Sequence, residues 1–465
     1  MKRFLITGCL LLVSAHSSAQ AKAGALDMLS LPRPNIEAAL SADAAWPSPK
    51  PYRFGVGIPV RLTPATAGLW QTLPSGLQVW RLRVGASEAR SLSFAFSRFQ
   101  LPQGAELSVS APDGSDRHGP YLAEHATAGQ LWTPPVVGAA ALIELRLPAG
   151  AGSGLGLELT QVNYGFRSFD AAGTEEEPQA KLMSCNVDVA CMQGDEWRNE
   201  SRAVARLLVG GVIACSGTLM NNTARDFKPY VLTANHCFKA SGFEASSTVV
   251  LWNYQKSKCR GAMPSGGGGI GGDNSGNTQT GATMRSNDLF LTPGVSVAMN
   301  SQADFALIEL SQKPSAAFRV YYSGWDRRPL APIGVVGIHH PEAQPKNISL
   351  TNRPTTISDI AGAPDAALGS FKYFLNLQGW EQGSTASGSS GSGLWNKEHR
   401  LVGNLTGGVP QESCPHTGSV IYFRFFSAWN YASKLPGRNL PQFLDPRRTG
   451  VQVLDGAYPN IRTPR

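Results

Sequence analysis

The sequence predicts an all-β protein, and three observations carry that prediction. Gly (50 residues) and Pro (32) are plentiful, while charged residues make up only 16% of the 465-residue chain, a mix that suits strands and turns better than long helices. Short apolar runs with period-two alternation recur along the chain, as in antiparallel strands. The cysteines that follow residue 184 are even in number, which is typical of disulfides in an oxidising compartment. The length predicts two or three domains.

Residues 1–19 are predicted to be a secretory signal peptide. The chain begins "MKRFLITGCLLLVSAHSSAQ", in which two basic residues precede an apolar run from Phe4 to Ala15 and small residues end near Ala19. This is the composition of a segment that is removed on export, although a buried N-terminal helix looks similar over so short a run. We therefore expect a secreted protein without stable membrane association.

Residues 20–179 are predicted to form a β-sandwich-like domain. From about Tyr52 to Arg167, runs such as "LQVWRLRV", "LSFAFSRF", "ALIELRL" and "LGLELTQVNYGF" alternate between turns of Gly, Pro and Asp, a pattern typical of an antiparallel sandwich. No cysteine falls inside this span. The stretch "DAAGTEEEPQAK", from Asp170 to Lys181, is acidic and lacks large apolar residues. It is expected to be an exposed linker that a protease can cut.

Charge and cysteine spacing argue against several other functions. The net charge of +8 is spread along the chain without a dense Lys/Arg block, so no nucleic-acid partner is expected. Zinc sites want closely paired ligands such as C-x2-C, and the sequence has no such pair. We expect three disulfides, whose connectivity the spacing leaves open, and neither a metal nor a cofactor.

The stretch "STASGSSGSGLW", from Ser384 to Trp395, can be a flexible linker or can hold a nucleophile. Its Gly/Ser density favours a linker. However, "RLVGNLTGG" follows almost at once with a strand-like pattern, so the run is expected to be a tight bend inside a folded domain. A serine held there becomes a nucleophile if a base, an orienting acid and oxyanion donors lie within reach.

A base and an acid are available for that serine. His236 ends the apolar run "YVLTANHC", and Asp304 opens the apolar run "DFALIEL". Taken singly, a histidine at a strand end is more often structural, and an aspartate before a strand more often forms a turn. Asp326 in "GWDRR" and Asp359 in "ISDI" are rival acids.

Several blocks carry a resemblance to a known family. "TANHC", "DFALIEL" and "GSSGSGL", in the order His, Asp, Ser, resemble the catalytic blocks of chymotrypsin-like serine proteases. "SCNVDVAC", "ACSGTLMNN", "WNYQKSKC", "GWDRR" and "GIHHPE" resemble the secreted bacterial lysyl endopeptidases over roughly residues 180–456. The resemblance implies a chymotrypsin-like double antiparallel β-barrel at residues 180–465, preceded by a β-rich propeptide at residues 20–179.

The resemblance also implies roles for individual residues. His236 would be the general base, Asp304 its orienting acid and Ser390 the nucleophile, with the amides of Gly388 and Ser390 forming the oxyanion hole. The implied disulfides are Cys185–Cys414, Cys191–Cys259 and Cys215–Cys237. The N-terminal domain would be a folding aid and inhibitor of a monomeric endopeptidase that acts on proteins or peptides. The alternative for this domain is a permanent sugar- or surface-binding module.

The substrate pocket departs from the family pattern. Family members hold the substrate lysine with an aspartate shortly before a "YGRVF" motif, whereas here "YFRFF" (residues 422–426) is preceded at that position by Val420, and Thr406 stands where the family usually has a histidine. A buried lysine without a counter-charge is strongly disfavoured. We therefore expect an uncharged residue at P1, the substrate residue before the scissile bond. The residues expected to line the pocket are Ser384, Thr406, Gly407, Gly408 and Val420.

Two alternatives remain for the function. A lysyl- or arginyl-specific endopeptidase would need Glu381 or Glu412 as the counter-charge in the pocket. A catalytically inactive, protease-like binding protein would keep the cleft and lose turnover.

Overall fold

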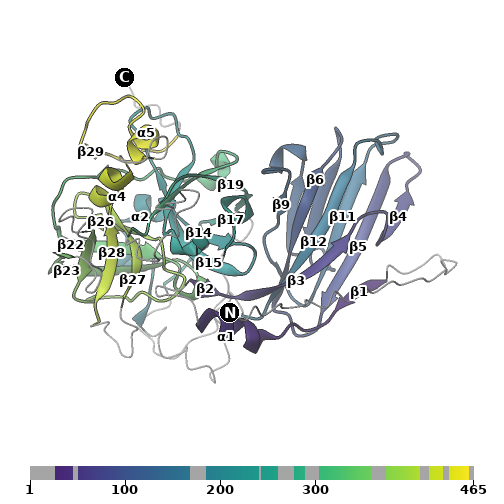
Figure 1. Cartoon of the computed structure of the whole chain (residues 1–465), viewed down its shortest axis with the longest axis horizontal. Coiled ribbons are helices and arrows are strands. Elements are labelled where there is room, and N and C mark those ends of the chain that lie inside the picture. The colour runs from purple at the N-terminus through teal and green to yellow at the C-terminus, as the bar shows by residue number, and fades with distance from the viewer. Residues whose placement is uncertain are drawn as a thin grey trace, which may run out of the picture.

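The computed structural model of the chain describes residues 27–44, 51–167, 185–239, 242–259, 277–287, 303–358, 373–408, 418–432 and 439–459. Figure 1 shows these residues as two bodies, with β1–β12 mostly in one and β13–β29 in the other. The prediction of an all-β protein is confirmed, since four β-sheets account for most of the regular structure in these ranges. The predicted signal peptide and linker lie outside the described residues.

The N-terminal body is a sandwich of two sheets. One has the order β1-β5-β11-β7-β8 with β4 beside β5, and the other has the order β10-β6-β12-β3 with β9 beside β6. The strands are β1 (Met28–Leu31), β3 (Gly55–Leu62), β4 (Leu69–Thr72), β5 (Gln78–Ala86), β6 (Ser91–Gln100), β7 (Glu106–Ser110), β8 (Arg117–Tyr121), β9 (Leu131–Trp132), β10 (Val136–Val137), β11 (Ala140–Leu147) and β12 (Gly156–Gly165).

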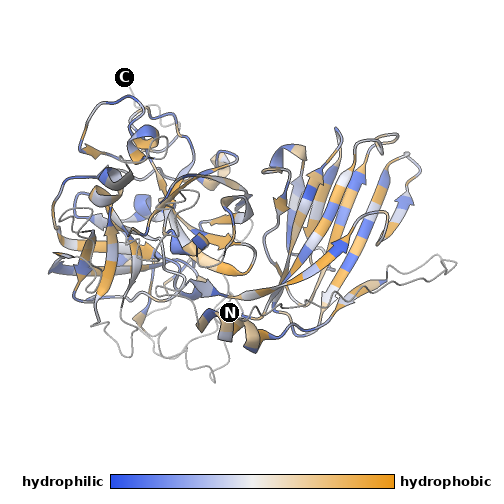
Figure 2. Cartoon of the chain, in the orientation of Figure 1, coloured by the Kyte–Doolittle hydropathy of each residue, from blue (hydrophilic) through white to orange (hydrophobic). Residues whose placement is uncertain are grey.

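Alternation explains why these runs form a sandwich. Side chains of one strand point to opposite faces, and Figure 2 shows apolar and polar residues alternating along the strands of this body. The inward residues, among them Trp80, Val84, Phe94 and Ile143, form one buried apolar cluster. The predicted strands in residues 78–165 are therefore confirmed.

The C-terminal body is built on two further sheets, which curl as chymotrypsin-like barrels do. The first, barrel 1, has the order β18-β17-β14-β15-β16-β20-β19. Its strands are β14 (Val204–Val209), β15 (Ile213–Met220), β16 (Tyr230–Thr233), β17 (Thr248–Trp252), β18 (Thr278–Thr280), β19 (Ala282–Asn287) and β20 (Ala306–Leu310).

The second, barrel 2, has the order β13-β23-β22-β26-β27-β28-β25-β24, with β21 joining β27 to β29. Its strands are β13 (Val187–Asp188), β21 (Trp325–Asp326), β22 (Ile333–His339), β23 (Asn347–Pro354), β24 (Thr356–Ser358), β25 (Phe374–Leu377), β26 (Gly393–Asn396), β27 (Leu401–Gly408), β28 (Val420–Arg424) and β29 (Val453–Leu454).

Helices are few and short in the described ranges. They are α1 (Ile36–Ala44), α2 (Arg198–Ala203), α3 (His236–Lys239), α4 (Phe425–Ala432) and α5 (Leu440–Leu444). α4 packs through Phe425 and Trp429 against Trp325. No helix in these ranges has both the length and the apolar character needed to span a membrane.

One strand differs from the sequence expectation. β2 (Tyr52–Arg53) was expected in the sandwich, but it pairs antiparallel with β15 of barrel 1, with Arg53 opposite Ile213. The reason is burial, because Tyr52 and Phe54 pack with Leu208 and other barrel residues in an apolar cluster of their own. The first residues of the predicted sandwich thus belong to barrel 1.

Two of the three predicted disulfides are confirmed. Cys191 is bonded to Cys259, and Cys215 is bonded to Cys237. The latter bond joins β15 to α3, the helix that begins at His236. The pairing of Cys185 with Cys414 stays a prediction, because Cys414 lies outside the described residues.

A buried lysine makes the stability of the protein dependent on pH. The Lys346 amine is fully buried and donates to the carbonyl of Ser201 at 2.6 Å. Burial, and secondarily the charge of Arg202, lowers its pKa to about 7 from the ordinary 10.5. Between these pH values the unfolded chain binds the proton that the folded chain has lost, so the free energy of unfolding rises with pH, by at most about 1.4 kcal/mol per unit.

We therefore expect Lys346→Met to flatten the pH dependence of stability between pH 7 and 10. The measurement is the urea midpoint at several pH values, made on a Ser390→Ala background so that proteolysis cannot interfere. Equal slopes with and without the lysine would contradict the expectation.

Candidate active site

His236 and Asp304 meet because β16 and β20 are neighbouring strands. The pairing of Thr233 with Ala306 sets the register, and it brings the residue before β20 beside the residues after β16. His236 Nδ1 lies 2.8 Å from Asp304 Oδ2, and the backbone N–H of His236 donates to Oδ1 at 2.9 Å. Both side chains are buried, and the acid fixes the ring as well as the backbone that carries it.

The second ring nitrogen of His236, Nε2, takes no part in the contact with Asp304. Because Nδ1–H donates to the carboxylate, Nε2 carries the lone pair that can accept a proton. Nε2 is buried and has no hydrogen-bond partner among the described residues. Asn404 of β27 donates to the Asp304 carbonyl at 2.8 Å, so barrel 2 also anchors the acid.

Ser390 lies in the loop before β26, pressed against barrel 1. The Ser216 amide donates to the Ser390 carbonyl at 2.8 Å. The next residue must be glycine: Gly391 has φ +82°, and a Cβ there would lie 2.1 Å from Thr233 Oγ1. This contact sets the Ser390 loop against the end of β16, the strand that leads to His236.

The same loop holds two backbone N–H groups that donate no hydrogen bond to the described residues. Glu342 N–H donates to the Ser387 carbonyl at 2.6 Å. In a trans peptide the carbonyl and the following N–H point in opposite directions, so the Gly388 N–H points away from Glu342. Neither this amide nor that of Ser390 donates a hydrogen bond within the described part of the chain. Two backbone N–H groups without an acceptor can together bind an oxyanion.

A buried histidine that the sequence analysis missed supports this loop. Ser389 Oγ lies 2.8 Å from His339 Nδ1, and His339 Nε2 lies 3.0 Å from Ser349 Oγ, which donates to the Ser384 carbonyl. Burial lowers the pKa of His339 to about 3, so the ring is neutral. Since Ser349 has given its hydrogen to a carbonyl, His339 Nε2–H donates to Ser349, and Nδ1 accepts from Ser389. The one sequence signal was "GIHHPE", where an apolar strand ends in paired histidines.

We expect His339→Leu to lower kcat by about tenfold, the cost of leaving a buried hydroxyl unpaired, while KM changes little. His339 touches the loop rather than the substrate, so the effect falls on the chemical step. Steady-state kinetics on a peptide ester would measure both constants. His118→Leu is the matched control, since His118 is also a buried histidine but lies in the sandwich. An unchanged kcat in His339→Leu would exclude a positioning role.

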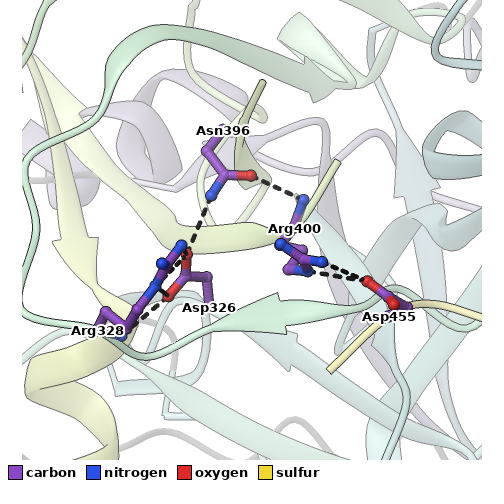
Figure 3. A network of polar contacts seen from close by, with 5 residues as sticks. All are labelled: Asp326, Arg328, Asn396, Arg400 and Asp455. Atoms are coloured by element: carbon purple, nitrogen blue, oxygen red, sulfur yellow. Dashed lines mark hydrogen bonds and ion pairs between the residues drawn. The ribbon is translucent and has the colours of Figure 1, made fainter. Parts of the chain in front are cut away.

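The rival acid Asp326 is engaged elsewhere. Its carboxylate accepts from Arg328 Nη2 at 2.5 Å and from Asn396 Nδ2 at 3.2 Å. Figure 3 shows the carboxylate between these two side chains. The side-chain oxygen of Asn396 accepts from the Arg400 backbone N–H, and the Arg400 guanidinium donates to Asp455. This network joins strands of barrel 2 and does not reach His236. Asp359, the other rival, lies outside the described residues.

The residues predicted for the substrate pocket fall into two groups. Gly408 pairs with Val420 and Gly407 with Ile421 across β27 and β28, and the register shifts between Leu405 and Gly407, where Thr406 lies. Thr406 Oγ1 is buried without a partner in the described residues. Ser384 is joined instead to the His339 network through its carbonyl.

The side chain of Val420 lies in an apolar environment. It is fully buried in a cluster with Leu377, Trp380 and Leu405. Glu381, one of the two acids considered as a counter-charge, is exposed and accepts from the Asn352 amide at 2.6 Å. Glu412, the other, lies outside the described residues.

One cluster near the site has metal-ligand residue types. Ligand atoms of His236, Cys215 and Cys237 lie within 4.8 Å of one another. The two sulfurs are bonded to each other, so they cannot act as the thiolates that a metal would need. The cluster is therefore a disulfide next to His236 rather than a metal site.

Comparison with known proteins settles the family. A family model described as "Lysyl endopeptidase, C-terminal domain" matches residues 180–423, more than half of the chain, and one described as "Lysyl endopeptidase N-terminal domain" matches residues 30–165. The chain belongs to the lysyl endopeptidase family. The lysyl endopeptidase of Pseudomonas aeruginosa is 28% identical to it over 421 residues, which are 83% of this chain and 82% of that protein.

Solved structures of serine proteases are similar at a lower level. An inactive form of Rv3671c from M. tuberculosis is 13% identical, with a TM-score of 0.31 over 50% of this chain and 87% of that one. A serine endoprotease from Yersinia pestis is 18% identical, with a TM-score of 0.32 over 53% of this chain and 68% of that one. As a member of the lysyl endopeptidase family with curled β-sheets, the protein is a trypsin-like serine endopeptidase, a hydrolase of proteins or peptides.

Proposed function

We propose that this serine endopeptidase works through His236, Asp304 and Ser390 and forms an acyl-enzyme. The observation that carries the proposal is the double hydrogen bond from His236 to Asp304. Among the described residues it leaves a buried Nε2 without a partner, and the Gly388 and Ser390 amides of the nucleophile loop donate no hydrogen bond there. Most buried polar side-chain atoms in proteins have a hydrogen-bond partner, so an unpartnered ring nitrogen on a histidine held by a carboxylate supports a role in proton transfer.

The mechanism follows from these atoms. Ser390 Oγ attacks the carbonyl carbon of the scissile bond while His236 Nε2 takes its proton, and Asp304 stabilises the imidazolium. The amides of Gly388 and Ser390 bind the oxyanion. The tetrahedral intermediate expels the amine, which takes the proton from His236, and a water activated by the same nitrogen then hydrolyses the ester at Ser390. His236 need not already bond Ser390 for this, because such bonds often tighten only when substrate binds.

We further propose that P1 is uncharged. An ammonium placed beside Val420 would lose its hydration and find a cluster of Leu, Trp and Tyr side chains instead of a carboxylate. The alternative, Lys or Arg specificity, would need Glu412, since Glu381 is already engaged by β23.

The precursor is proposed to be secreted by means of residues 1–19 and cut in the linker near residue 180, leaving residues 180–465 as a monomeric enzyme. In this proposal residues 20–179 act as a propeptide that assists folding, because the sandwich adds β2 to barrel 1. In the same proposal the N-terminal domain also inhibits the enzyme until it is removed.

The test is active-site labelling combined with a P1 profile. A fluorophosphonate probe should modify Ser390, as located by peptide mass mapping, and a mixed-peptide library should give cleavage after uncharged residues. A folded protein that neither reacts with the probe nor cleaves any peptide would favour the inactive binding protein.

A further inference from the structure

We propose that the side-chain hydroxyl of Ser216 is a positioning group for the reaction. It holds the peptide group between Gly388 and Ser389, and through that peptide it sets the direction of the two N–H groups that bind the oxyanion. The inference rests on the proposed function, since it takes the amides of Gly388 and Ser390 as the oxyanion hole. Ser216 belongs to barrel 1, whereas the nucleophile loop (residues 386–392) precedes β26 of barrel 2.

Ser216 contacts the nucleophile loop because of its place in β15. Successive side chains of a strand point to opposite faces, so Cys215 lies in the core of barrel 1, where it is bonded to Cys237, and Ser216 points to the other face. The pairing of β15 with β16 covers Thr218 to Met220 and stops before Ser216. The Ser216 N–H therefore lies outside that ladder, and it donates to the Ser390 carbonyl at 2.8 Å.

The hydroxyl of Ser216 has one orientation that satisfies both of its partners. The backbone N–H of His340 donates to Oγ at 2.9 Å, and a backbone N–H can only donate. The hydroxyl hydrogen therefore goes to the other partner, the Gly388 carbonyl, at 3.0 Å. Ser216 and His340 are fully buried, so neither hydrogen bond is exposed to solvent.

Three consecutive peptide groups of the nucleophile loop are involved. The first carries the Gly388 N–H, and the third carries the Ser390 N–H. The carbonyls of these two peptides accept from the backbone N–H groups of Glu342, at 2.6 Å, and of Ser392, at 3.0 Å. Each outer peptide is thus anchored on its carbonyl side, and its N–H points the opposite way.

The middle peptide joins the two outer ones and is held by Ser216. Its carbonyl is that of Gly388, and its N–H is that of Ser389, which donates to the Ala386 carbonyl at 3.0 Å. Ala386 lies in the same loop, so within the described residues the bond from Ser216 is the one that ties this peptide to another part of the fold. Because a peptide group is rigid, a rotation of the middle one also turns the N–H groups on either side of it.

Gly388 gives the middle peptide a freedom that the Ser216 bond restricts. Its φ is +92°, and a Cβ there would lie 2.9 Å from the His340 carbonyl and from the Glu342 amide, so the position requires glycine. Glycine is also the residue with the widest choice of backbone conformations. Without the hydroxyl of Ser216, the Gly388 carbonyl is therefore free to rotate away from its present direction.

The other contacts of Ser216 do not depend on its side chain. Its N–H donates to the Ser390 carbonyl, and its own carbonyl accepts from Thr233 Oγ1 at 2.7 Å. Both bonds remain when the side chain is replaced. A substitution at this position therefore leaves the nucleophile loop attached to barrel 1 and removes the hydroxyl alone.

The experiment compares the full-length wild-type chain with four variants, expressed and secreted in the same way. They are Ser216→Ala, the pair Ser216→Thr and Ser216→Val, which share one shape and differ in the hydroxyl, and Ser323→Ala as control. Ser323 is also fully buried, and its hydroxyl also joins two groups, since it donates to the Gly324 carbonyl at 2.9 Å and accepts from Trp395 Nε1 at 3.0 Å.

Two measurements separate the oxyanion from ordinary substrate binding. The first is kcat and KM per Ser390 titrated to completion with a fluorophosphonate, so that unfolded molecules are not counted. The second is the inhibition constant of a peptide trifluoromethyl ketone beside that of the peptide acid of the same sequence. Ser390 Oγ adds to the ketone carbon, its proton goes to His236, and the ketone oxygen becomes an oxyanion, whereas the acid binds without this addition.

We expect Ser216→Ala to lower kcat by about tenfold or more, a part of the loss that removal of a whole oxyanion donor causes, with KM within about twofold. The inhibition constant of the ketone should rise by the factor by which kcat/KM falls, while that of the acid should not change. Ser216→Thr should keep most of the activity, and Ser216→Val should lose it as Ser216→Ala does. Ser323→Ala should have a lower melting temperature and an unchanged kcat.

An unchanged kcat in both Ser216→Ala and Ser216→Val would overturn the proposal. Equal losses in the Thr and Val variants would also overturn it, because they would assign the effect to packing, and this pair keeps the test available if Ser216→Ala does not fold. A rise in KM and in the inhibition constant of the acid, with kcat unchanged, would make Ser216 a residue of substrate binding instead. Lack of labelling at Ser390 in the wild type would count against the proposed function.

Discussion

Replacing Ser390 by alanine is expected to lower kcat by about 10⁵- to 10⁶-fold, because removal of the nucleophile leaves only binding and the oxyanion donors. The readout is hydrolysis of a peptide substrate by purified protein. Thr385→Ala is the control, since Thr385 lies in the same loop, is half-buried, and has no assigned role. It should retain activity within about twofold.

The same variant reports on processing of the precursor. If the enzyme cuts its own linker, Ser390→Ala should be secreted at full length, while the wild type is shortened near residue 180, and mass spectrometry of the secreted protein distinguishes the two. Identical cutting of both proteins would assign the cut to another protease. If, in addition, neither protein hydrolysed any peptide, Ser390 would not be a working nucleophile.

The contact between His236 and Asp304 was implied by the family resemblance, and the apolar run beside each residue agrees with it without singling the pair out. β16 ends just before His236, and β20 begins just after Asp304. Antiparallel neighbours of this kind bring such ends together once the strands pair. The sandwich strands could be predicted from the residues themselves, since period-two patterning marks each of them.

The supports of the site could not be predicted, because they depend on contacts between distant segments. His339 and Ser389, which share a hydrogen bond, are 50 residues apart in the chain, and Ser349 and Ser384, which share another, are 35 residues apart. Neither pair shows a local pattern. The prediction that β2 belongs to the sandwich was wrong for a similar reason. Alternation indicates which face of a strand is apolar, but it does not indicate which sheet the strand joins.

The second prediction with a large expected effect concerns Val420 and the preference for the P1 residue. It is fully buried among apolar side chains and sits opposite Gly408 on β27. By the general cost of an unpaired buried charge, several kcal/mol, the wild type should cleave after Lys with kcat/KM about 10³-fold below that for Met. A matched pair of peptides that differ only at P1 measures the ratio.

Val420→Asp should then raise kcat/KM for the Lys peptide by about 10²- to 10³-fold, because the new carboxylate pairs with the ammonium that otherwise stays uncompensated. Without that substrate the buried carboxylate is itself unpaired, so a lower melting temperature is expected. Val420→Asn is the control, since it has the size and polarity of the aspartate but no charge. A gain in Asp but not in Asn would assign P1 preference to charge at this position. Efficient cleavage after Lys by the wild type would instead require a counter-charge elsewhere, and Glu412 would be the next residue to replace.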